Sequence, residues 1–118
     1  MPVPAPAPAP AEALLDEARR LADLGRAEEA RRQAQRYLER VPDSADAHFL
    51  LGVLGAQLHD VEAAATSLRR ALYLDPDHYE ALCHFALLAE EHGEHANASQ
   101  LRRRAARVQA RTGKRGRP

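Results

Sequence analysis

Residues 45–78 read ADAHFLLGVLGAQLHDVEAAATSLRRALYLDPDH, and this stretch decides the fold. Apolar and small residues recur at helical spacing on both sides of residues 59–60, which indicates two helices joined by a turn. Pro76 ends the second helix because proline lacks the amide hydrogen that a helix interior needs. Gly52 and Ala64 are small enough to let the two helices cross at close range. The stretch therefore predicts one helix–turn–helix pair.

The same pattern occurs three times along the chain. Pro42 and Pro76 are 34 residues apart, and residues 47–52 (AHFLLG) recur loosely as residues 81–86 (ALCHFA). This period divides most of the chain into three units of 34 residues, namely 11–44, 45–78 and 79–112. The helices expected from it span residues 11–24, 27–41, 45–58, 61–74, 79–92 and 95–111.

Residues at the ends of these helices support the division. Gly25, His59 and Gly93 lie between the helices of a pair, where a left-handed backbone conformation ends a helix. Ser44 and Asp77 precede the following helices, and we predict that their side chains cap them. Composition agrees, because Ala, Leu, Arg and Glu favour helices and the chain has few aromatic or β-branched residues.

Some positions depart from the repeat. Gly55 stands where a large residue is expected, and Arg102 replaces a core apolar residue. Glu17 stands where the later units have Leu51 and Phe85. The last helix keeps one apolar stripe and is polar elsewhere, as the exposed end of a stacked array requires; the stripe is Ala98, Leu101, Ala105 and Val108.

Small residues at matching positions make the units similar to a known family. They are Ala18, Gly52 and Ala86 in the first helices, and Ala30, Ala64 and Ala98 in the second helices. With the terminal prolines and the period, this pattern resembles the tetratricopeptide repeat. The resemblance implies an all-α fold, a right-handed α-solenoid of three 34-residue helix–turn–helix tetratricopeptide repeats, which acts as a scaffold for protein–protein interaction.

One stretch is similar to a narrower group. Residues 71–82 (ALYLDPDHYEAL) and 84–89 (HFALLA) resemble the tetratricopeptide region at the C-terminus of chemoreceptor methyltransferases of the CheR type, particularly the Wsp-like branch. In that group an S-adenosylmethionine-dependent methyltransferase precedes the repeats. The resemblance implies the non-catalytic partner-binding region of a bacterial chemotaxis-type methyltransferase, with a chemoreceptor or the methyltransferase domain as partner. The alternative is a generic tetratricopeptide adaptor in another bacterial pathway.

Both flanks of the repeats have a biased composition. Residues 1–10 alternate proline with small residues, which predicts a semi-rigid Pro/Ala-rich linker. Because a spacer joins two parts, we expect a larger domain upstream of it. Residues 113–118 are predicted to form a basic disordered tail.

The formal net charge is zero, but the charges are unevenly distributed. Residues 1–100 carry a net charge of −8, whereas residues 101–118 carry +8 and no acid. The zero sum excludes a globally basic nucleic-acid binder. Cys83 is the only cysteine, so an internal disulfide is impossible and a reducing, cytoplasmic compartment is expected. No apolar run reaches the ~18–20 residues that span a membrane, so membrane insertion is not predicted.

The chain carries no catalytic motif, so we predict that it is not itself an enzyme and needs no cofactor. His92 and His95 straddle Gly93 at a predicted turn, and we interpret them as surface residues rather than metal ligands. Cys83 and His84 are adjacent on a helix and point about 100° apart, which is unsuitable for a nucleophile and its base.

A binding surface is the remaining candidate site. In tetratricopeptide domains the first helices of the units line a concave groove, so the resemblance places a protein or peptide ligand there. The middle of this predicted surface is apolar and its edge is acidic, which suits a ligand with apolar anchors and basic flanks. The groove-facing positions are Glu12, Leu15, Asp16, Arg19, Asp46, Phe49, Leu50, Val53, Gln57, Glu80, Cys83, His84, Leu87 and Glu91. Phe49, Val53 and Leu87 have a second interpretation, as packing residues between units.

The basic end of the chain has three interpretations. It is a solvated polar cap, a surface for nucleic acid, or a partner for the acidic body of a neighbouring molecule or upstream domain. Nucleic-acid binding is disfavoured because aromatic residues do not interleave with the basic ones. Exposed groove and end surfaces also favour self-association. The residues of the basic end are Arg102, Arg103, Arg107 and Arg111.

Overall fold

The computed structural model describes residue 2 and residues 10–116; most of the predicted linker therefore lies outside the described residues. Over this part of the chain it contains six helices and no strand. The helices are α1 (Ala11–Asp23), α2 (Ala27–Arg40), α3 (Ala45–Gln57), α4 (Val61–Leu74), α5 (Tyr79–Glu91) and α6 (His95–Gly116). The all-α prediction is confirmed.

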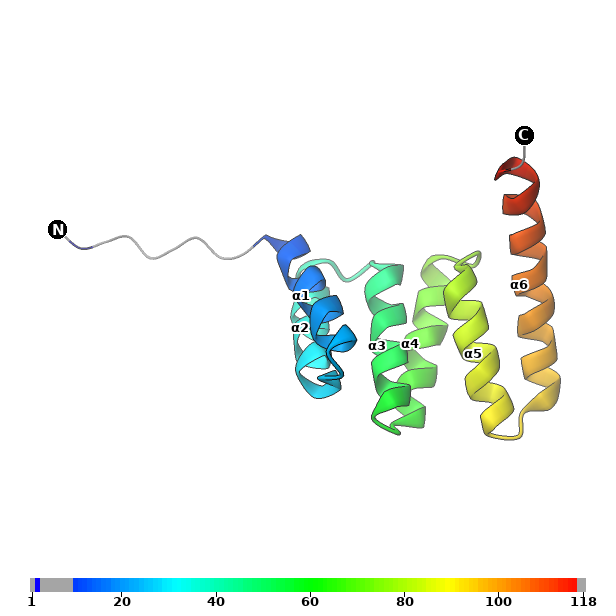
Figure 1. The fold of residues 1–118 in the computed structure, drawn as a ribbon, viewed down its shortest axis with the longest axis horizontal. Coiled ribbons are helices and arrows are strands. Elements are labelled where there is room, and N and C mark those ends of the chain that lie inside the picture. Colours follow the sequence, from blue (N-terminus) through cyan, green and yellow to red (C-terminus); the bar gives the residue numbers. More distant parts are fainter. Residues whose placement is uncertain (1, 3–9, 117–118) are drawn as a thin grey trace.

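The helices form a stack of three antiparallel pairs (Figure 1). Within the pairs, α1 packs against α2, α3 against α4, and α5 against α6. Successive pairs meet through α2–α3 and α4–α5, and α3 also contacts both α1 and α5. The structure is therefore the predicted α-solenoid, with α1, α3 and α5 as neighbours along one side.

The three turns within the pairs have one geometry. Gly25, His59 and Gly93 all have positive φ values, of 76°, 59° and 78°. After each of them, the amide of the next residue donates a hydrogen bond to the carbonyl five residues earlier; for Asp60 and Gly55 the N···O distance is 2.8 Å. This bond satisfies a carbonyl that the helix end would leave unpaired. The sequence prediction of left-handed ends is confirmed at all three positions.

Two glycines let α3 and α4 approach closely. A Cβ atom on Gly55 would lie 3.0 Å from the backbone nitrogen of Ala64 and 3.2 Å from its Cα. A Cβ on Gly52 would lie 2.7 Å from Cγ of Leu68. The departure from the repeat at Gly55 thus has a physical reason, because the backbone of α4 occupies the space that a large side chain would need.

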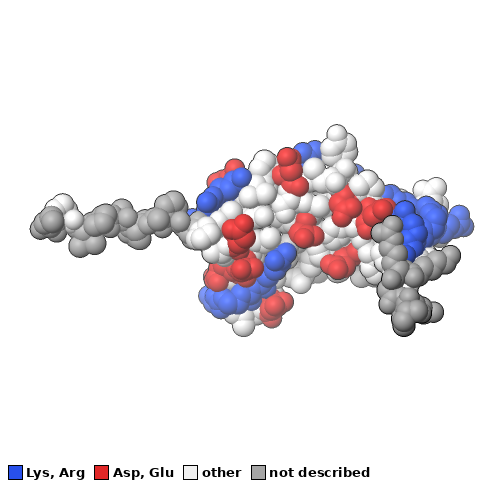
Figure 2. All heavy atoms as spheres, turned by 90° about the horizontal axis from the view of Figure 1, so that it is seen from above, with Lys and Arg blue, Asp and Glu red and all other residues white. Residues whose placement is uncertain are grey.

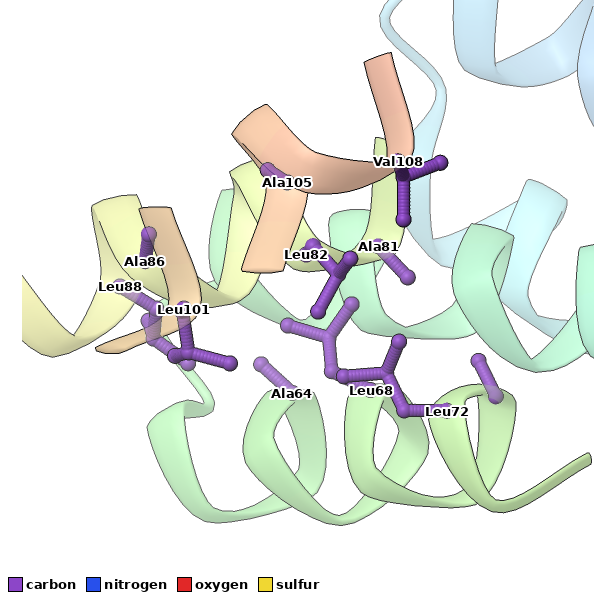
Figure 3. Close-up of a cluster of buried hydrophobic side chains, with 11 residues drawn as sticks. Ala64, Leu68, Leu72, Ala81, Leu82, Ala86, Leu88, Leu101, Ala105 and Val108 are labelled. Carbon is purple, nitrogen blue, oxygen red and sulfur yellow. The ribbon is translucent and has the colours of Figure 1, made fainter. Parts of the chain in front are cut away.

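The main core lies between α4, α5 and α6 (Figure 3). Leu68 from α4 and Leu82 from α5 are among the largest fully buried side chains, and Leu101 and Val108 from α6 close the cluster. The predicted apolar stripe of the last helix is confirmed, because all four of its residues are buried. A smaller cluster of Leu21, Ala30 and Leu54 joins the first pair to the second.

Helix capping follows the prediction at one position and differs at the other. Ser44 caps α3, since its hydroxyl accepts a hydrogen bond from the Ala47 amide at 3.1 Å. The prediction that Asp77 caps α5 is wrong. His78 is the cap, and its Nδ1 accepts from the Ala81 amide at 3.1 Å. Asp77 instead pairs with Arg111 at 3.0 Å.

We expect His78→Ala to lower the free energy of unfolding by about 1–2 kcal/mol, because it removes both the cap and the hydrogen bond to Asp46. Asp77→Ala is the matched control and should cost less than about 1 kcal/mol, since it removes only an exposed ion pair. Urea denaturation of the two variants measures both values. Equal losses would show that His78 is not the cap on which α5 depends.

The last helix differs from the prediction in length. α6 continues to Gly116, whereas the sequence predicts a helix end at residue 111 and a disordered tail over 113–118. Gly113 lies within α6 and does not share the positive φ of Gly25 and Gly93. Arginine favours helices, which agrees with the continuation of α6, and residues 117–118 of the predicted tail lie outside the described residues.

No helix in the described part of the chain is both long and apolar enough to cross a lipid bilayer.

Candidate functional site

The predicted groove positions all lie on α1, α3 and α5, and we call the surface that they form the groove face. Leu15 is the exception in burial: only 8% of it is exposed, so it belongs to the core rather than to a surface. The other positions are partly or fully exposed. Leu87 is the most prominent apolar residue among them, with 54% of its surface exposed.

A hollow of about 400 Å³ lies on this face between α3 and α5. We call it the α3–α5 hollow. Its predicted members are Val53, Gln57, His84, Leu87 and Glu91. The sequence did not indicate the remaining ones, which come from α3, the α3–α4 turn, α4 and the end of α5; they are Gly52, Ala56, His59, Val61, Leu68, Leu88 and His92.

Phe49 is a packing residue on the groove face. Its ring lies 5.0 Å from the His78 ring and 5.2 Å from the His84 ring, measured between centroids. His78 is buried, and because its Nδ1 accepts from a backbone amide, its Nε2 donates to Asp46 Oδ1 at 2.9 Å. The cluster therefore joins the start of α3 to the start of α5, and Phe49 makes packing contacts between the units.

The groove face is predominantly acidic. Glu12, Asp16, Asp46, Glu80 and Glu91 lie on it with exposed side chains, and Arg19 is the one basic residue among the predicted positions. Figure 2 shows acidic residues over the middle of the stack and basic residues both at the α6 end and at the α1–α2 end. A ligand with basic side chains therefore meets an attractive field here, and salt weakens that attraction because the acids are exposed.

The basic end is partly neutralised within the chain. Arg102 donates to Glu90 at 3.2 Å, Arg111 pairs with Asp77, and Arg104 donates to the Pro76 carbonyl at 3.3 Å. The pKa of Glu90 lies below its ordinary value because the ring of His95 and then Arg102 bond to its carboxylate. These bonds support the interpretation of α6 as a polar cap on the stack.

His92 and His95 are not gathered into a metal site. Nδ1 of His92 lies 2.9 Å from the Leu88 carbonyl, and Nδ1 of His95 lies 2.8 Å from Glu90. Within the described residues, no three His, Cys, Asp or Glu side chains are placed to hold a metal ion.

The repeated turns and paired helices match one known family. The sequence model of the tetratricopeptide repeat family matches residues 15–79, which is more than half of the chain. This chain belongs to the tetratricopeptide repeat family.

Two curated relatives are much longer than the region that matches this chain. A probable biofilm formation methyltransferase, WspC of Pseudomonas putida, is 45% identical over 89 residues, which is 75% of this chain and 21% of the relative. WspC of Pseudomonas aeruginosa is 44% identical over 92 residues, which is 78% of this chain and 22% of that relative. The chain thus spans about one fifth of the length of these methyltransferases. The predicted similarity to the Wsp-like group is confirmed.

Solved structures share the tetratricopeptide fold. MamA has a TM-score of 0.81 at 23% identity, with 85% of this chain and 58% of that chain covered. SycD, the type III secretion translocator chaperone of Yersinia enterocolitica, has a TM-score of 0.81 at 20% identity, with 85% and 76% covered. The second tetratricopeptide domain of Spaghetti, bound to an HSP90 peptide, has a TM-score of 0.79 at 16% identity, with 83% and 91% covered. At these identities the likeness shows the fold alone.

Proposed function

We propose that this chain is the partner-binding region of a chemotaxis-type protein methyltransferase in the bacterial cytoplasm, and that its groove face binds a segment of another protein. The α3–α5 hollow carries the proposal. It combines apolar walls with an acidic border, and it lies where neighbouring units of the stack meet. The similarity to WspC supports the link to a methyltransferase.

The geometry of the hollow defines the ligand by its chemistry. Val53, Ala56 and Leu87 offer a concave apolar surface that accepts one aliphatic or aromatic side chain. Glu91 borders the same hollow, and Glu80 lies on the same helix near its start. A helix or extended segment with an apolar anchor and basic neighbours fits this arrangement.

The catalytic step belongs elsewhere in this proposal. The relatives are about five times as long as the region that matches this chain. An S-adenosylmethionine-dependent domain would carry out the methyl transfer, and the repeats would hold its substrate receptor or the domain itself.

Two candidate partners can be separated by titration. The 118-residue chain is titrated by calorimetry with the cytoplasmic region of a chemoreceptor from the same bacterium and, separately, with the isolated methyltransferase domain. We expect one of the two to bind and its affinity to fall as salt rises, because the groove face is acidic. Failure of both to bind would contradict the proposed function and favour an adaptor role in another pathway.

A further inference from the structure

A second hollow lies between α5 and α6, and the proposed ligand site does not include it. Its volume is about 440 Å³, and we call it the α5–α6 hollow. Two of the exposed large apolar side chains line it, Leu87 at 54% and Tyr79 at 38% exposure. The other lining residues are Cys83, Ala86, Arg102, Ala105, Ala106 and Gln109.

The position of this hollow in the stack indicates a missing neighbour. α3 packs against both helices of the first pair, and α5 packs against both helices of the second pair. By the same stacking rule, a further helix would cover the third pair at the α5–α6 hollow. No helix in the described part of the chain covers it, so its apolar side chains meet solvent. Exposed apolar patches of this kind mark interaction surfaces.

The two helices that border the hollow carry opposite charge, although Glu90 of α5 is already bonded to His95 and Arg102 of α6. α5 contains Glu80, Glu90 and Glu91 and no basic residue, whereas α6 contains basic residues and no acid. A second copy, related by a two-fold axis parallel to the helices, would place α5 of each copy along α6 of the other. The acidic helix of each copy would then face the basic helix of the other, which is the self-complementarity that a two-fold interface needs.

End-to-end stacking of copies fits less well. In that arrangement α1 of the next copy would enter the α5–α6 hollow. Glu17 of α1 stands where α3 and α5 have Leu51 and Phe85, and it is paired with Arg20 at 2.7 Å. Stacking would partly bury this ion pair against the neighbouring copy, and desolvation of the charges opposes such burial.

We propose that two copies of this chain associate through the α5–α6 hollow, with α5 of each copy along α6 of its partner. This surface goes beyond the proposed ligand site, with which it shares Leu87 of the α3–α5 hollow and Cys83 of the groove face.

Sedimentation equilibrium of the 118-residue chain over a series of concentrations tests the proposal. We expect a monomer–dimer equilibrium, and Ala106→Glu should weaken the dimer about tenfold or more, because it places an acid opposite the acidic α5 of the partner. Ala110→Glu is the matched control. It makes the same change on the same helix, but Ala110 lines a different hollow, so the dimer should be unaffected. Circular dichroism checks that both variants keep their helices.

Alkylation of Cys83 reports on burial of the α5–α6 hollow, because Cys83 is the only cysteine and it lines that hollow. Its rate of alkylation by iodoacetamide should fall as the concentration of the unmodified chain rises, and should not change with concentration in Ala106→Glu.

Val53→Arg, which alters only the α3–α5 hollow, should leave the dimer intact, so this proposal can fail independently of the proposed function. A monomer at all concentrations would overturn the proposal, as would a dimer that Ala106→Glu leaves intact. Slower alkylation of a monomer on addition of the methyltransferase domain would assign the hollow to that domain instead.

Discussion

Leu68→Ala should lower the free energy of unfolding by about 2–5 kcal/mol, which is the usual cost of removing a leucine side chain from a core. Leu68 of α4 is 2% exposed and belongs to the main cluster, which also contains residues of α5 and α6. The core is small, so few neighbouring side chains can move to fill the cavity. Urea denaturation followed by circular dichroism measures the change. A loss below about 1 kcal/mol would show that this cluster does not hold the units together.

A Gly52→Ala variant tests the packing around Leu68 more specifically. Alanine favours helices over glycine by about 1 kcal/mol, so Gly52→Ala would stabilise an isolated α3. In the folded chain its Cβ would lie 2.7 Å and 2.8 Å from two carbon atoms of Leu68, and overpacking costs about 1–3 kcal/mol. We therefore expect Gly52→Ala alone to be destabilising.

The double variant should cost less than the sum of the two single variants, because Leu68→Ala makes room for the new methyl group. The first unit already combines the corresponding pair, Ala18 and Ala34, and both residues are fully buried. Additive losses, within about 0.5 kcal/mol, would contradict direct contact between positions 52 and 68.

Val53→Arg should weaken binding of the protein ligand by about 10-fold to 100-fold, the range of a residue at the centre of an interface. Val53 is half-buried and forms part of the apolar wall of the α3–α5 hollow. Arginine would fill the space for an apolar anchor and would repel basic residues of the ligand. Calorimetric titration with the partner identified for the unmodified chain measures the loss.

Thr66→Arg is the control for this variant. Thr66 is exposed on α4, outside the groove face, and the substitution adds the same charge to a side chain of similar size. Its affinity should equal that of the unmodified chain. Equal weakening by both variants would mean that net charge, rather than the hollow, governs binding.

Local signals in the sequence predict the helices well, because each turn is made by residues within it. Gly25 and Gly93 adopt the left-handed conformation that glycine favours, and His59 adopts it at the matching position of the second unit. The end of α6 was harder to predict, since Gly113 remains helical and lacks this turn geometry.

Features that depend on contacts between units could not be predicted in the same way. His78 caps α5 in preference to Asp77 because Asp46, 32 residues earlier, accepts a hydrogen bond from the other ring nitrogen. The α3–α5 hollow likewise includes Leu68, a residue of α4 whose side chain lies close to Gly52 of α3. Helical periodicity identifies one face of one helix and does not show which side chains of other helices complete a surface.

Hydrogen exchange of the 118-residue chain, with and without its bound partner, tests the proposed function most directly. Exchange measured by mass spectrometry shows which helices become protected. We expect protection in α3 and α5, where the α3–α5 hollow lies, and little change in α2 and α4. Protection confined to α2 and α4, or to the basic α6, would contradict binding at the groove face.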